Sequence, residues 1–342
     1  MIRVAVIGTG GMANNHAKSF SRVPGCRLTA ACDVNIQRAK AFAERHAMPA
    51  NAIYDNIEGL LADNVCDAVT IVATDNAHAP LALAAIKAGK HVLCEKPLAT
   101  NYADARKMAR AAQAKGVINM VNLSYRNSSA IHKAAKIVAR GGIGRVMHFD
   151  ACYLQSWLSA KYWGDWKASD AWLWRLSSRH GSKGVLGDIG VHILDFATYP
   201  IGEVKSMSCR LKTFPKAPKN RIGQYTLDAN DSAVITLEMA GGALGTIHTS
   251  RWATGYKNCL QLRIFGDRGA IRLDLDRSTT QLEICKGPDV DTATWQPLDC
   301  GKVPSIYQRF VRSIRTGVND QPDFARGAAV QKLLDECFDQ NG

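Results

Sequence analysis

Short apolar runs alternate with amphipathic stretches along the first third of the chain. The apolar runs are rich in β-branched residues and predict buried strands at residues 2–7, 27–32, 66–73, 91–94 and 118–121. Apolar residues at helical spacing separate them, at residues 13–23, 36–46, 80–88 and 101–115. Strands that alternate with helices favour a parallel sheet with right-handed crossovers. The fold class is therefore α/β, with a doubly wound first domain over residues 1–123.

The hydrophobic pattern changes near residue 124. After a predicted helix at 129–139, apolar and polar residues alternate along longer segments. These segments are residues 146–154, 204–212, 231–239, 243–252, 260–265 and 270–275. Such alternation predicts a large open, mainly antiparallel sheet with one polar or helix-covered face. We expect a second α/β domain over residues 124–342, whose last amphipathic helix, at 325–338, is a candidate to pack back on the first domain.

A glycine-rich turn follows the first predicted strand. It reads Gly8-Thr-Gly10-Gly11-Met12-Ala13, and the second strand ends in Asp33. In a Rossmann unit the first glycine permits a tight turn, the second lets the backbone approach a pyrophosphate, and a small third residue lets helix and strand pack closely. The helix N-terminus attracts the phosphates, and the acid accepts hydrogen bonds from the ribose. A dinucleotide site is predicted, and a glycine-turned unit without a ligand is the alternative.

Further polar residues follow the carboxyl ends of predicted strands, where parallel sheets bind ligands. They are Thr74, Asn76, His78, Glu95, Lys96 and Asn122. Lys96 stands out because Pro97 biases it toward an extended backbone at the end of a short apolar strand. A lysine there is suited to donate a hydrogen bond to a substrate oxygen or to tune the pKa of a partner. An ordinary surface lysine is the other interpretation.

The segment Gly187-Asp188-Ile-Gly190-Val-His192-Ile-Leu-Asp195 carries a second group of reactive side chains. If a helix begins here, Asp188 and His192 share one face and Asp195 adjoins it. A histidine backed by a carboxylate is suited to take a proton from a hydroxyl group. Two other interpretations stay open: Asp188 as a helix N-cap with His192 in the core, and a metal site made by the three residues, which lacks an obvious fourth ligand.

Composition and charge narrow the class of protein. No run approaches the ~18 apolar residues of a membrane span, and the chain opens with a predicted strand rather than a signal sequence. The ten cysteines are scattered and form no CxxC pair, so we expect no metal and a reduced, cytoplasmic location. The net charge of +13 is spread along the chain without a nucleic-acid-binding motif, so no nucleic-acid or membrane partner is expected.

In their order along the chain, these motifs resemble the Gfo/Idh/MocA oxidoreductase family over nearly the whole sequence. The resemblance implies a Rossmann domain, an open-sheet domain, and hydride transfer between a nicotinamide and a ring carbon of a sugar, anhydrosugar or cyclitol. It implies Lys96, Asp188 and His192 as catalytic residues, with Asn122 among the substrate contacts. Trp174-Arg175, in a tryptophan-rich insertion, matches a pair that contacts sugar in some members.

Two departures bear on the substrate more than on the reaction. Asp75 stands between Thr74 and Asn76, where many members have proline, and Gly181-Ser-Lys-Gly184 replaces a glycine triplet. The alternatives are a dihydrodiol or aldehyde dehydrogenase of the same fold, and a sensor that binds NAD or sugar without turnover.

Asp33 also predicts which cofactor is used. A carboxylate repels the 2′-phosphate of NADP, so we expect NAD to be preferred. Arg38 is the one nearby basic group, and we interpret it as an exposed helix arginine. For the second domain, the broad face of its open sheet predicts a homo-oligomer, a dimer or a tetramer.

Overall fold

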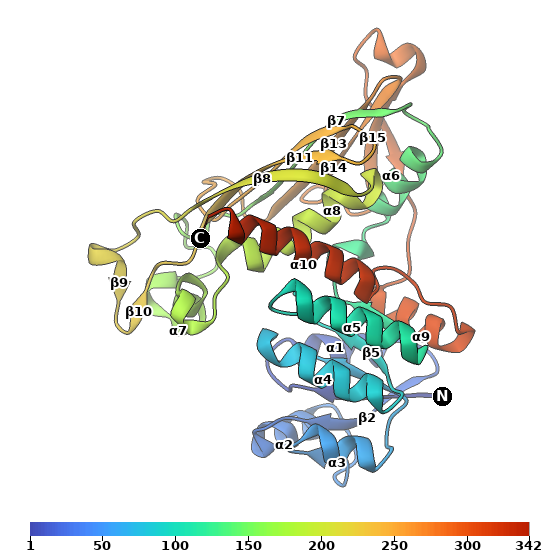
Figure 1. The fold of residues 1–342 in the computed structure, drawn as a ribbon, viewed down its shortest axis with the longest axis vertical. Helices are drawn as coiled ribbons and strands as arrows, with labels where there is room; N and C mark the ends of the chain where they lie inside the picture. Colours follow the sequence, from blue (N-terminus) through green and yellow to red (C-terminus); the bar gives the residue numbers. More distant parts are fainter. Residues whose placement is uncertain (342) are drawn as a thin grey trace. The chain divides into compact units, whose positions relative to one another are not determined.

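The computed structural model describes residues 1–341 and divides the chain into two compact units (Figure 1). Unit 1 consists of residues 1–124 and 304–332, and unit 2 of residues 125–303 together with the chain from Leu333 onward. The sequence-based division placed all of 124–342 in the second domain. The structure differs because a helix near the C-terminus completes the core of unit 1.

Unit 1 alternates strands and helices through most of its length. Its elements are β1 (Ile2–Ile7), α1 (Ala13–Phe20), β2 (Cys26–Cys32), α2 (Ile36–Arg45), β3 (Ile53–Tyr54), α3 (Ile57–Ala62), β4 (Ala68–Ile71), α4 (Asp75–Lys87), β5 (His91–Cys94), α5 (Tyr102–Lys115), β6 (Asn119–Val121) and α9 (Ile306–Thr316). The strands form one parallel sheet in the order β3-β2-β1-β4-β5-β6. The predicted Rossmann architecture is confirmed.

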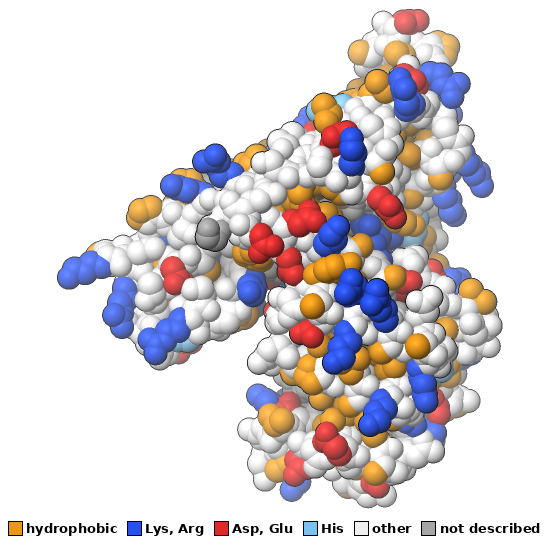
Figure 2. Space-filling view, viewed as in Figure 1, with side chains coloured by type: hydrophobic (Ala, Val, Ile, Leu, Met, Phe, Trp, Pro, Cys, Tyr) orange, Lys and Arg blue, Asp and Glu red, His pale blue; other side chains and the backbone are white. Residues whose placement is uncertain are grey.

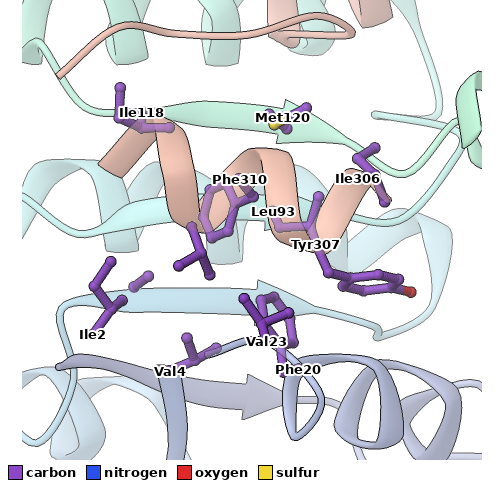
Figure 3. Close-up of a cluster of buried hydrophobic side chains, with 12 residues drawn as sticks. Ile2, Val4, Phe20, Val23, Leu93, Ile118, Met120, Ile306, Tyr307 and Phe310 are labelled. Atoms are coloured by element: carbon purple, nitrogen blue, oxygen red, sulfur yellow. The ribbon is translucent and has the colours of Figure 1, made fainter. Parts of the chain in front are cut away.

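Helix α9 belongs to unit 1 because its apolar side packs on that sheet. A capping box between Ser305 and Gln308 starts the helix, and Gly317 ends it in the left-handed conformation. Figure 3 shows Tyr307 and Phe310 of α9 among side chains from the sheet and from α1. The sequence-based prediction did not include this helix.

The segment Thr74–His78 was predicted as a loop, but α4 already begins at Asp75. Pro80 was interpreted as the start of the helix, since proline is favoured in a first turn. It lies inside α4 instead. The missing N–H of Pro80 leaves the carbonyl of Asn76 without its usual donor, and Asn76 is exposed, so water can take that place. The first turn of α4 therefore carries Asn76 and His78.

Unit 2 is built on an eight-stranded sheet in the order β16-β15-β14-β13-β7-β12-β11-β8. Its strands are β7 (Val146–Leu154), β8 (Val204–Lys212), β11 (Ser232–Met239), β12 (Leu244–Ser250), β13 (Cys259–Gly266), β14 (Gly269–Asp274), β15 (Gln281–Lys286) and β16 (Gln296–Asp299). Only the pairing of β7 with β12 is parallel among these strands. The mainly antiparallel sheet is confirmed, although β15 and β16 were not predicted.

Helices and short turns complete unit 2. They include α6 (Ser129–Ala139), α7 (Asp170–Leu173), a π-helix (Leu186–Gly190), α8 (Val191–Ile201) and the small hairpin β9 (Arg221–Ile222) and β10 (Tyr225–Thr226). Helices α6 and α8 contact each other and strands of the sheet. The last helix, α10 (Phe324–Asp339), runs through the point where the chain passes from unit 1 to unit 2.

Two properties of the surface bear on partners. Among the described residues, no helix combines the length and the apolar character needed to cross a bilayer. On the face in Figure 2, lysine and arginine side chains are scattered in small groups rather than gathered into one large patch.

Candidate active site

The glycine turn of unit 1 has the geometry of a phosphate-binding turn. Gly8 has a φ of 84°, and a Cβ there would lie 2.6 Å from the carbonyl oxygen of Val72, so only glycine fits. Gly10 and Gly11 face open space, because a Cβ at either position would have no described atom within 4 Å. Helix α1 begins after Met12 without a side-chain cap. Its N-terminus is therefore open to an anion.

Asp33 lies at the end of β2 and is only 6% exposed. Its carboxylate accepts hydrogen bonds from the backbone N–H and hydroxyl of Thr9 (2.8 and 2.9 Å) and from the N–H of Asn35 (2.9 Å). Burial acts to raise the pKa of Asp33, but these bonds and a bond from Arg38 lower it to about 2. The group is thus held as a carboxylate beside the glycine turn.

Arg38 lies on the surface of α2 and is paired with Asp33. Its guanidinium donates through Nη2 to Oδ1 of Asp33 (2.6 Å) and through Nε to Oδ2 (3.1 Å). The reason is local: Arg38 lies in the first turn of α2, and Asn35 caps that helix, so the arginine rises beside the end of β2. Arg38 is therefore an exposed helix arginine, as interpreted from the sequence, but one that is paired with Asp33.

Glu95 is held in a buried polar network beneath the sheet's carboxyl edge. Its Oε1 lies 2.7 Å from Nε2 of His16 and accepts from Nδ2 of Asn122 (2.5 Å), while Nδ1 of His16 lies 2.8 Å from the hydroxyl of Thr70. Asn122 also reaches the hydroxyl of Tyr307 (3.5 Å). Burial acts to raise the pKa of Glu95, but His16 and Asn122 lower it to about 2. The network holds Glu95, the residue that directly precedes Lys96, in a fixed position.

Lys96 is half-buried at the carboxyl end of β5, as predicted from the sequence. Its backbone N–H donates to Oε2 of Glu95 (3.1 Å), and the Lys96–Pro97 peptide is cis. The carbonyl of Pro97 is bonded to Nδ1 of His78 (2.8 Å), whose Nε2 lies 3.1 Å from the carbonyl of Ala73. Two buried side chains, Glu95 and His78, therefore hold the segment that carries the lysine.

The remaining predicted cofactor residues lie nearer the surface of the same edge. Thr74 and Asn76 are exposed, and the hydroxyl of Thr74 donates to Oδ1 of Asn76 (2.7 Å). His78, in contrast, is 0% exposed, and Asn122 is 4% exposed, with no hydrogen-bond partner for its Oδ1 among the described residues. The structure brings the predicted residues of unit 1 to the carboxyl edge of the parallel sheet, where Thr74 and Asn76 are exposed and His78 and Asn122 are buried.

In unit 2, Asp188 lies on a π-helix that runs directly into α8. π-Helices are rare in proteins, and those that occur are often found at functional sites. A Cβ at Gly187 would lie 2.3 Å from the Cβ of Lys183, so close packing requires glycine there, and at Gly190 a Cβ would lie 2.8 Å from the Cδ1 of Leu186. Asp188 is not the helix cap: Asn230 receives the N–H groups of Val185 and Leu186.

His192 lies one turn after Asp188 and is 9% exposed. The ring of Tyr125 meets the imidazole edge-on, with ring centroids 5.1 Å apart. The hydroxyl of Tyr125 bonds that of Tyr153, and Asn258 bonds both tyrosines. Burial and Tyr125 raise the pKa of Tyr153 far above its ordinary value, so this hydroxyl stays protonated. The ring that contacts the histidine is therefore held by a network of hydroxyl and amide groups.

Asp195, which was predicted to adjoin the face of Asp188 and His192, is paired with a buried arginine. Its carboxylate forms a two-point ion pair with Arg126, at 2.7 Å for both bonds, and the two side chains are 3% and 1% exposed. A buried arginine needs such a partner, since an unpaired charge in the interior is costly. No group of three potential metal ligands occurs in residues 1–341. The pair anchors α8 and leaves Asp188 and His192 as the candidate catalytic residues of this unit.

The tryptophan-rich insertion separates into core and surface residues. Trp157 and Trp166 are 3% and 4% exposed and pack in an apolar cluster with Leu173. Trp174 is 40% exposed, with the guanidinium of Arg175 4.7 Å from its ring centre. Trp163 and Trp172 are partly buried against this cluster, and Trp174 with Arg175 remains the pair proposed for sugar contact.

Sequence reasoning missed His16, Tyr125, Arg251 and Asn258. His16 follows the glycine turn on the inner face of α1, a position that periodicity marks as core. Arg251 follows β12 and donates to Oδ2 of Asp188 (3.0 Å). A buried basic residue is visible in a sequence only as an interruption of an apolar pattern, and its partner lies 63 positions away.

Known proteins resemble the chain over its whole length. Residues 2–123 match the sequence profile of the oxidoreductase family with an NAD-binding Rossmann fold, and residues 131–272 match the GFO/IDH/MocA C-terminal domain. Levoglucosan dehydrogenase of Pseudarthrobacter phenanthrenivorans is 29% identical, over 98% of this chain and 95% of its own. Inositol 2-dehydrogenase of Rubrobacter xylanophilus is 32% identical, over 80% of this chain and 71% of its own.

The fold of a solved relative agrees with these matches. A levoglucosan dehydrogenase in complex with NADH and levoglucosan superposes with a TM-score of 0.85 at 26% identity, covering 99% of this chain and 96% of that one. The match spans both units of the fold. Together with the sequence matches to both domains, it shows that the chain belongs to the Gfo/Idh/MocA family of NAD-binding oxidoreductases.

Proposed function

We propose that this protein is an NAD-dependent dehydrogenase that acts on a ring CH–OH group of a sugar, an anhydrosugar or a cyclitol. The observation that carries the proposal is the pair Asp188 and His192 on successive turns, in a chain that also has the NAD-type glycine turn. Relatives that align over most of the chain are named for levoglucosan and inositol. These substrates share a saturated ring with hydroxyl groups, which is the common class we assign.

The residues of unit 1 fit NAD. The open space over Gly10 and Gly11 and the uncapped start of α1 suit the pyrophosphate, and Asp33 suits the adenosine ribose. When bound, the nicotinamide supplies the hydride acceptor for oxidation, or the hydride for reduction. Thr74, Asn76 and Lys96 follow the neighbouring strands and are proposed to complete the cofactor contacts.

Proton transfer falls to residues of the chain itself. We assign His192 as the base that takes the proton of the reacting hydroxyl, because a neutral imidazole is the side chain best suited to this near neutral pH. Lys96 donates a hydrogen bond to the same oxygen and stabilises the negative charge that develops on it. Asp188 holds the substrate or orients the imidazole. In the reverse direction the same groups protonate a carbonyl oxygen.

Ring recognition is proposed for Trp174 and Arg175. An exposed indole can stack on the apolar face of a sugar ring, and the guanidinium beside it can donate to hydroxyl groups. Asn122 remains a proposed substrate contact; the residue is 4% exposed, and its Oδ1 has no hydrogen-bond partner in the described part of the chain.

The test is reduction of NAD with a panel of cyclitols, monosaccharides and anhydrosugars, followed by NADH absorbance. Sustained turnover with at least one ring polyol, lost in Lys96→Ala and His192→Ala, would support the proposal. Binding of NADH without turnover of any member of the panel would instead indicate a sensor. Turnover confined to aldehydes or dihydrodiols would indicate the other dehydrogenase class.

We also propose that the protein forms a homo-oligomer through the sheet face of unit 2 that α6 and α8 leave uncovered. Val234 of β11 and Leu244 of β12 are 56% and 57% exposed there, and large apolar side chains on an open sheet favour a partner surface. Light scattering coupled to size-exclusion chromatography would give the mass in solution. A monomer at micromolar concentration would contradict this assignment.

A further inference from the structure

Arg251 is a fully buried arginine that contacts the proposed catalytic carboxylate. It follows β12, is 0% exposed, and donates from Nη2 to Oδ2 of Asp188 (3.0 Å). The same guanidinium donates to two backbone carbonyls, that of Arg175 (3.0 Å) and that of Gly184 (3.3 Å). One planar group thus holds three points of the stretch 175–188, which lies 63 to 76 positions before it in the sequence. Arg is suited to this because its donors form a rigid fork.

The guanidinium itself is firmly held. Its central carbon lies 4.9 Å from the ring centre of Trp157, which is 3% exposed. The backbone N–H of Arg251 donates to the carbonyl of Asp231 (2.9 Å). Packing on one face and a fixed backbone leave the side chain little freedom, so the position it imposes on Asp188 is well defined.

A second buried ion pair lies behind Arg251. Nζ of Lys216 is 2.7 Å from Oδ2 of Asp231, and both side chains are 0% exposed. Burial lowers the pKa of Arg251, while the carboxylates of Asp188 and Asp231 act to raise it, so Arg251 interacts with both. The four side chains form two ion pairs, Lys216 with Asp231 and Arg251 with Asp188, and the pairs interact electrostatically through Asp231 and Arg251. Of these, only Asp188 reaches the surface, with 38% of its side chain exposed.

We propose that Arg251 is a positioning residue for the reaction: it fixes the orientation of Asp188 and joins it to the Trp174-Arg175 segment. The proposal rests on the function assigned above. The side chain of Asp188 is 38% exposed, and the hydrogen bond from the buried guanidinium favours one of its rotamers. Because one guanidinium binds both the carbonyl of Arg175 and the carboxylate of Asp188, the sugar-contacting segment and the catalytic carboxylate are held in one arrangement.

The first experiment follows the carboxyl carbon of Asp188 by NMR in protein labelled at the aspartate side-chain carbons, with Asp188→Asn to assign the signal. Arg251 donates to Asp188, Tyr153 interacts with it electrostatically, and His192 lies one turn further along the chain. In Arg251→Met we expect Asp188 to titrate about one pH unit higher or more, because a neighbouring cation favours the charged form. An unchanged titration would overturn the proposal. This readout does not need enzyme activity, so it remains decisive if the panel of ring polyols yields no turnover and the proposed function fails.

The second experiment is a double-mutant cycle between Arg251→Met and Asp188→Asn. If Arg251 acts through Asp188, Arg251→Met should lower kcat/KM by roughly 10- to 100-fold in the wild-type background. In the Asp188→Asn background, the same replacement should lower kcat/KM by less than about threefold. NADH affinity should stay unchanged. An equal loss of kcat/KM on Arg251→Met in both backgrounds would show a general structural effect and overturn the proposal.

Two further variants control the interpretation. Arg263→Met removes an arginine that pairs with Asp150 on the same sheet (2.7 Å) but is 57% exposed, and it should leave both readouts unchanged. Arg251→Lys keeps the charge without the fork, so it should preserve the titration of Asp188 while lowering kcat/KM. If Arg251→Met does not fold, the cycle with Arg251→Lys decides: a loss that persists undiminished in Asp188→Asn overturns the proposal.

Discussion

The guanidinium of Arg38 and the carboxylate of Asp33 form a two-point ion pair at the site proposed for the adenosine ribose. With the donors from Thr9 and Asn35, five donors converge on this carboxylate, which offers about four lone-pair sites. A ribose hydroxyl gains a place on Asp33 only when Arg38 leaves. The side chain of Arg38 is 53% exposed, so it can rotate away.

This relationship sharpens the prediction on cofactor choice. We expect NAD to be preferred over NADP by at least tenfold in kcat/KM, or about 1.4 kcal/mol, because the carboxylate of Asp33 repels a 2′-phosphate. Asp33→Ser should reduce the preference for NAD over NADP, and Asp33→Ser with Val34→Arg should reduce it further. Arg38→Ala should increase it, since the released guanidinium is the one group there that can pair with the phosphate. A wild-type preference for NADP would show that Arg38 outweighs Asp33.

Much of unit 1 could be predicted because local sequence dictates it. The turn from Gly8 to Ala13 and the acid at the end of β2 are short-range features, and the backbone demands of each are readable from residue type. The position of Lys96 after β5 was predicted in the same way, from the short apolar strand before it and from Pro97 after it. Helix α9 could not be placed, because nothing in residues 306–316 says which of two sheets its apolar side will cover.

The contacts between distant side chains were the part that sequence could not supply. Asp195 was grouped with Asp188 and His192 by helical spacing, but its partner is Arg126, and the choice depends on how α8 packs. Arg38 was interpreted as an exposed helix arginine, and it is exposed, but its ion pair with Asp33 was not foreseen. In both residues a charge–charge contact decides the side-chain position, and periodicity describes only burial.

Replacing Lys96 by alanine should lower kcat about 100-fold or more while leaving NAD affinity nearly unchanged. The ammonium group is proposed to act on the reacting oxygen, whereas the pyrophosphate is held by the glycine turn. Stopped-flow kinetics and NADH fluorescence titration would separate the two effects. Lys107→Ala, at an exposed position of α5, is the matched control. Near-normal turnover of Lys96→Ala would remove the lysine from the mechanism.

Replacing His192 by alanine should abolish most activity and also remove the fall in oxidation rate at acidic pH. The reason is that a base must be neutral to accept a proton, so protonation of His192 should slow the wild-type enzyme. The measurement is the pH profile of kcat/KM for oxidation, with NADH binding as the check on folding. If residual activity keeps the same acid limb, another group is the base, and Asp188 becomes the candidate.

The buried Glu95 predicts how stability depends on pH. Its pKa falls from the ordinary 4.5 to about 2 in the folded protein. A carboxylate of depressed pKa stabilises the fold above its unfolded pKa and loses that contribution as pH falls toward the folded value. The free energy of unfolding should therefore drop by about 3 kcal/mol between roughly pH 5 and pH 2 through this group alone.

Glu95→Gln tests this linkage by removing the charge with little change in shape. Urea unfolding at several pH values should give a shallower acid dependence than the wild type, together with lower stability at neutral pH. Glu58→Gln, at an exposed glutamate of α3, should leave the acid dependence unchanged. If Glu95→Gln has the wild-type slope, then the His16–Glu95 contact does not contribute to acid sensitivity.

The last prediction concerns the free edge of the sheet in unit 2. Strand β8 ends the sheet, and two side chains after α10 occupy its outward backbone groups. Gln340 accepts from the N–H of Cys209 (2.7 Å) and donates to the carbonyl of Met207 (3.1 Å). Asn341 accepts from the N–H of Leu211 (3.0 Å) and donates to the carbonyl of Cys209 (3.0 Å). The two amides thus pair with the edge as a further strand would.

Gln340→Ala with Asn341→Ala should expose this edge, and an unpaired strand edge is a template for aggregation. We expect a modest loss of stability, since each hydrogen bond contributes about 1 kcal/mol net, but a clear increase in aggregation on mild heating. Light scattering at a temperature below unfolding is the measurement. Gln37→Ala with Gln113→Ala, at exposed helix positions, is the matched control. Equal scattering from the two double variants would mean that the amides fill the edge without protecting it, and that the charged side chains of β8 keep the strand from pairing.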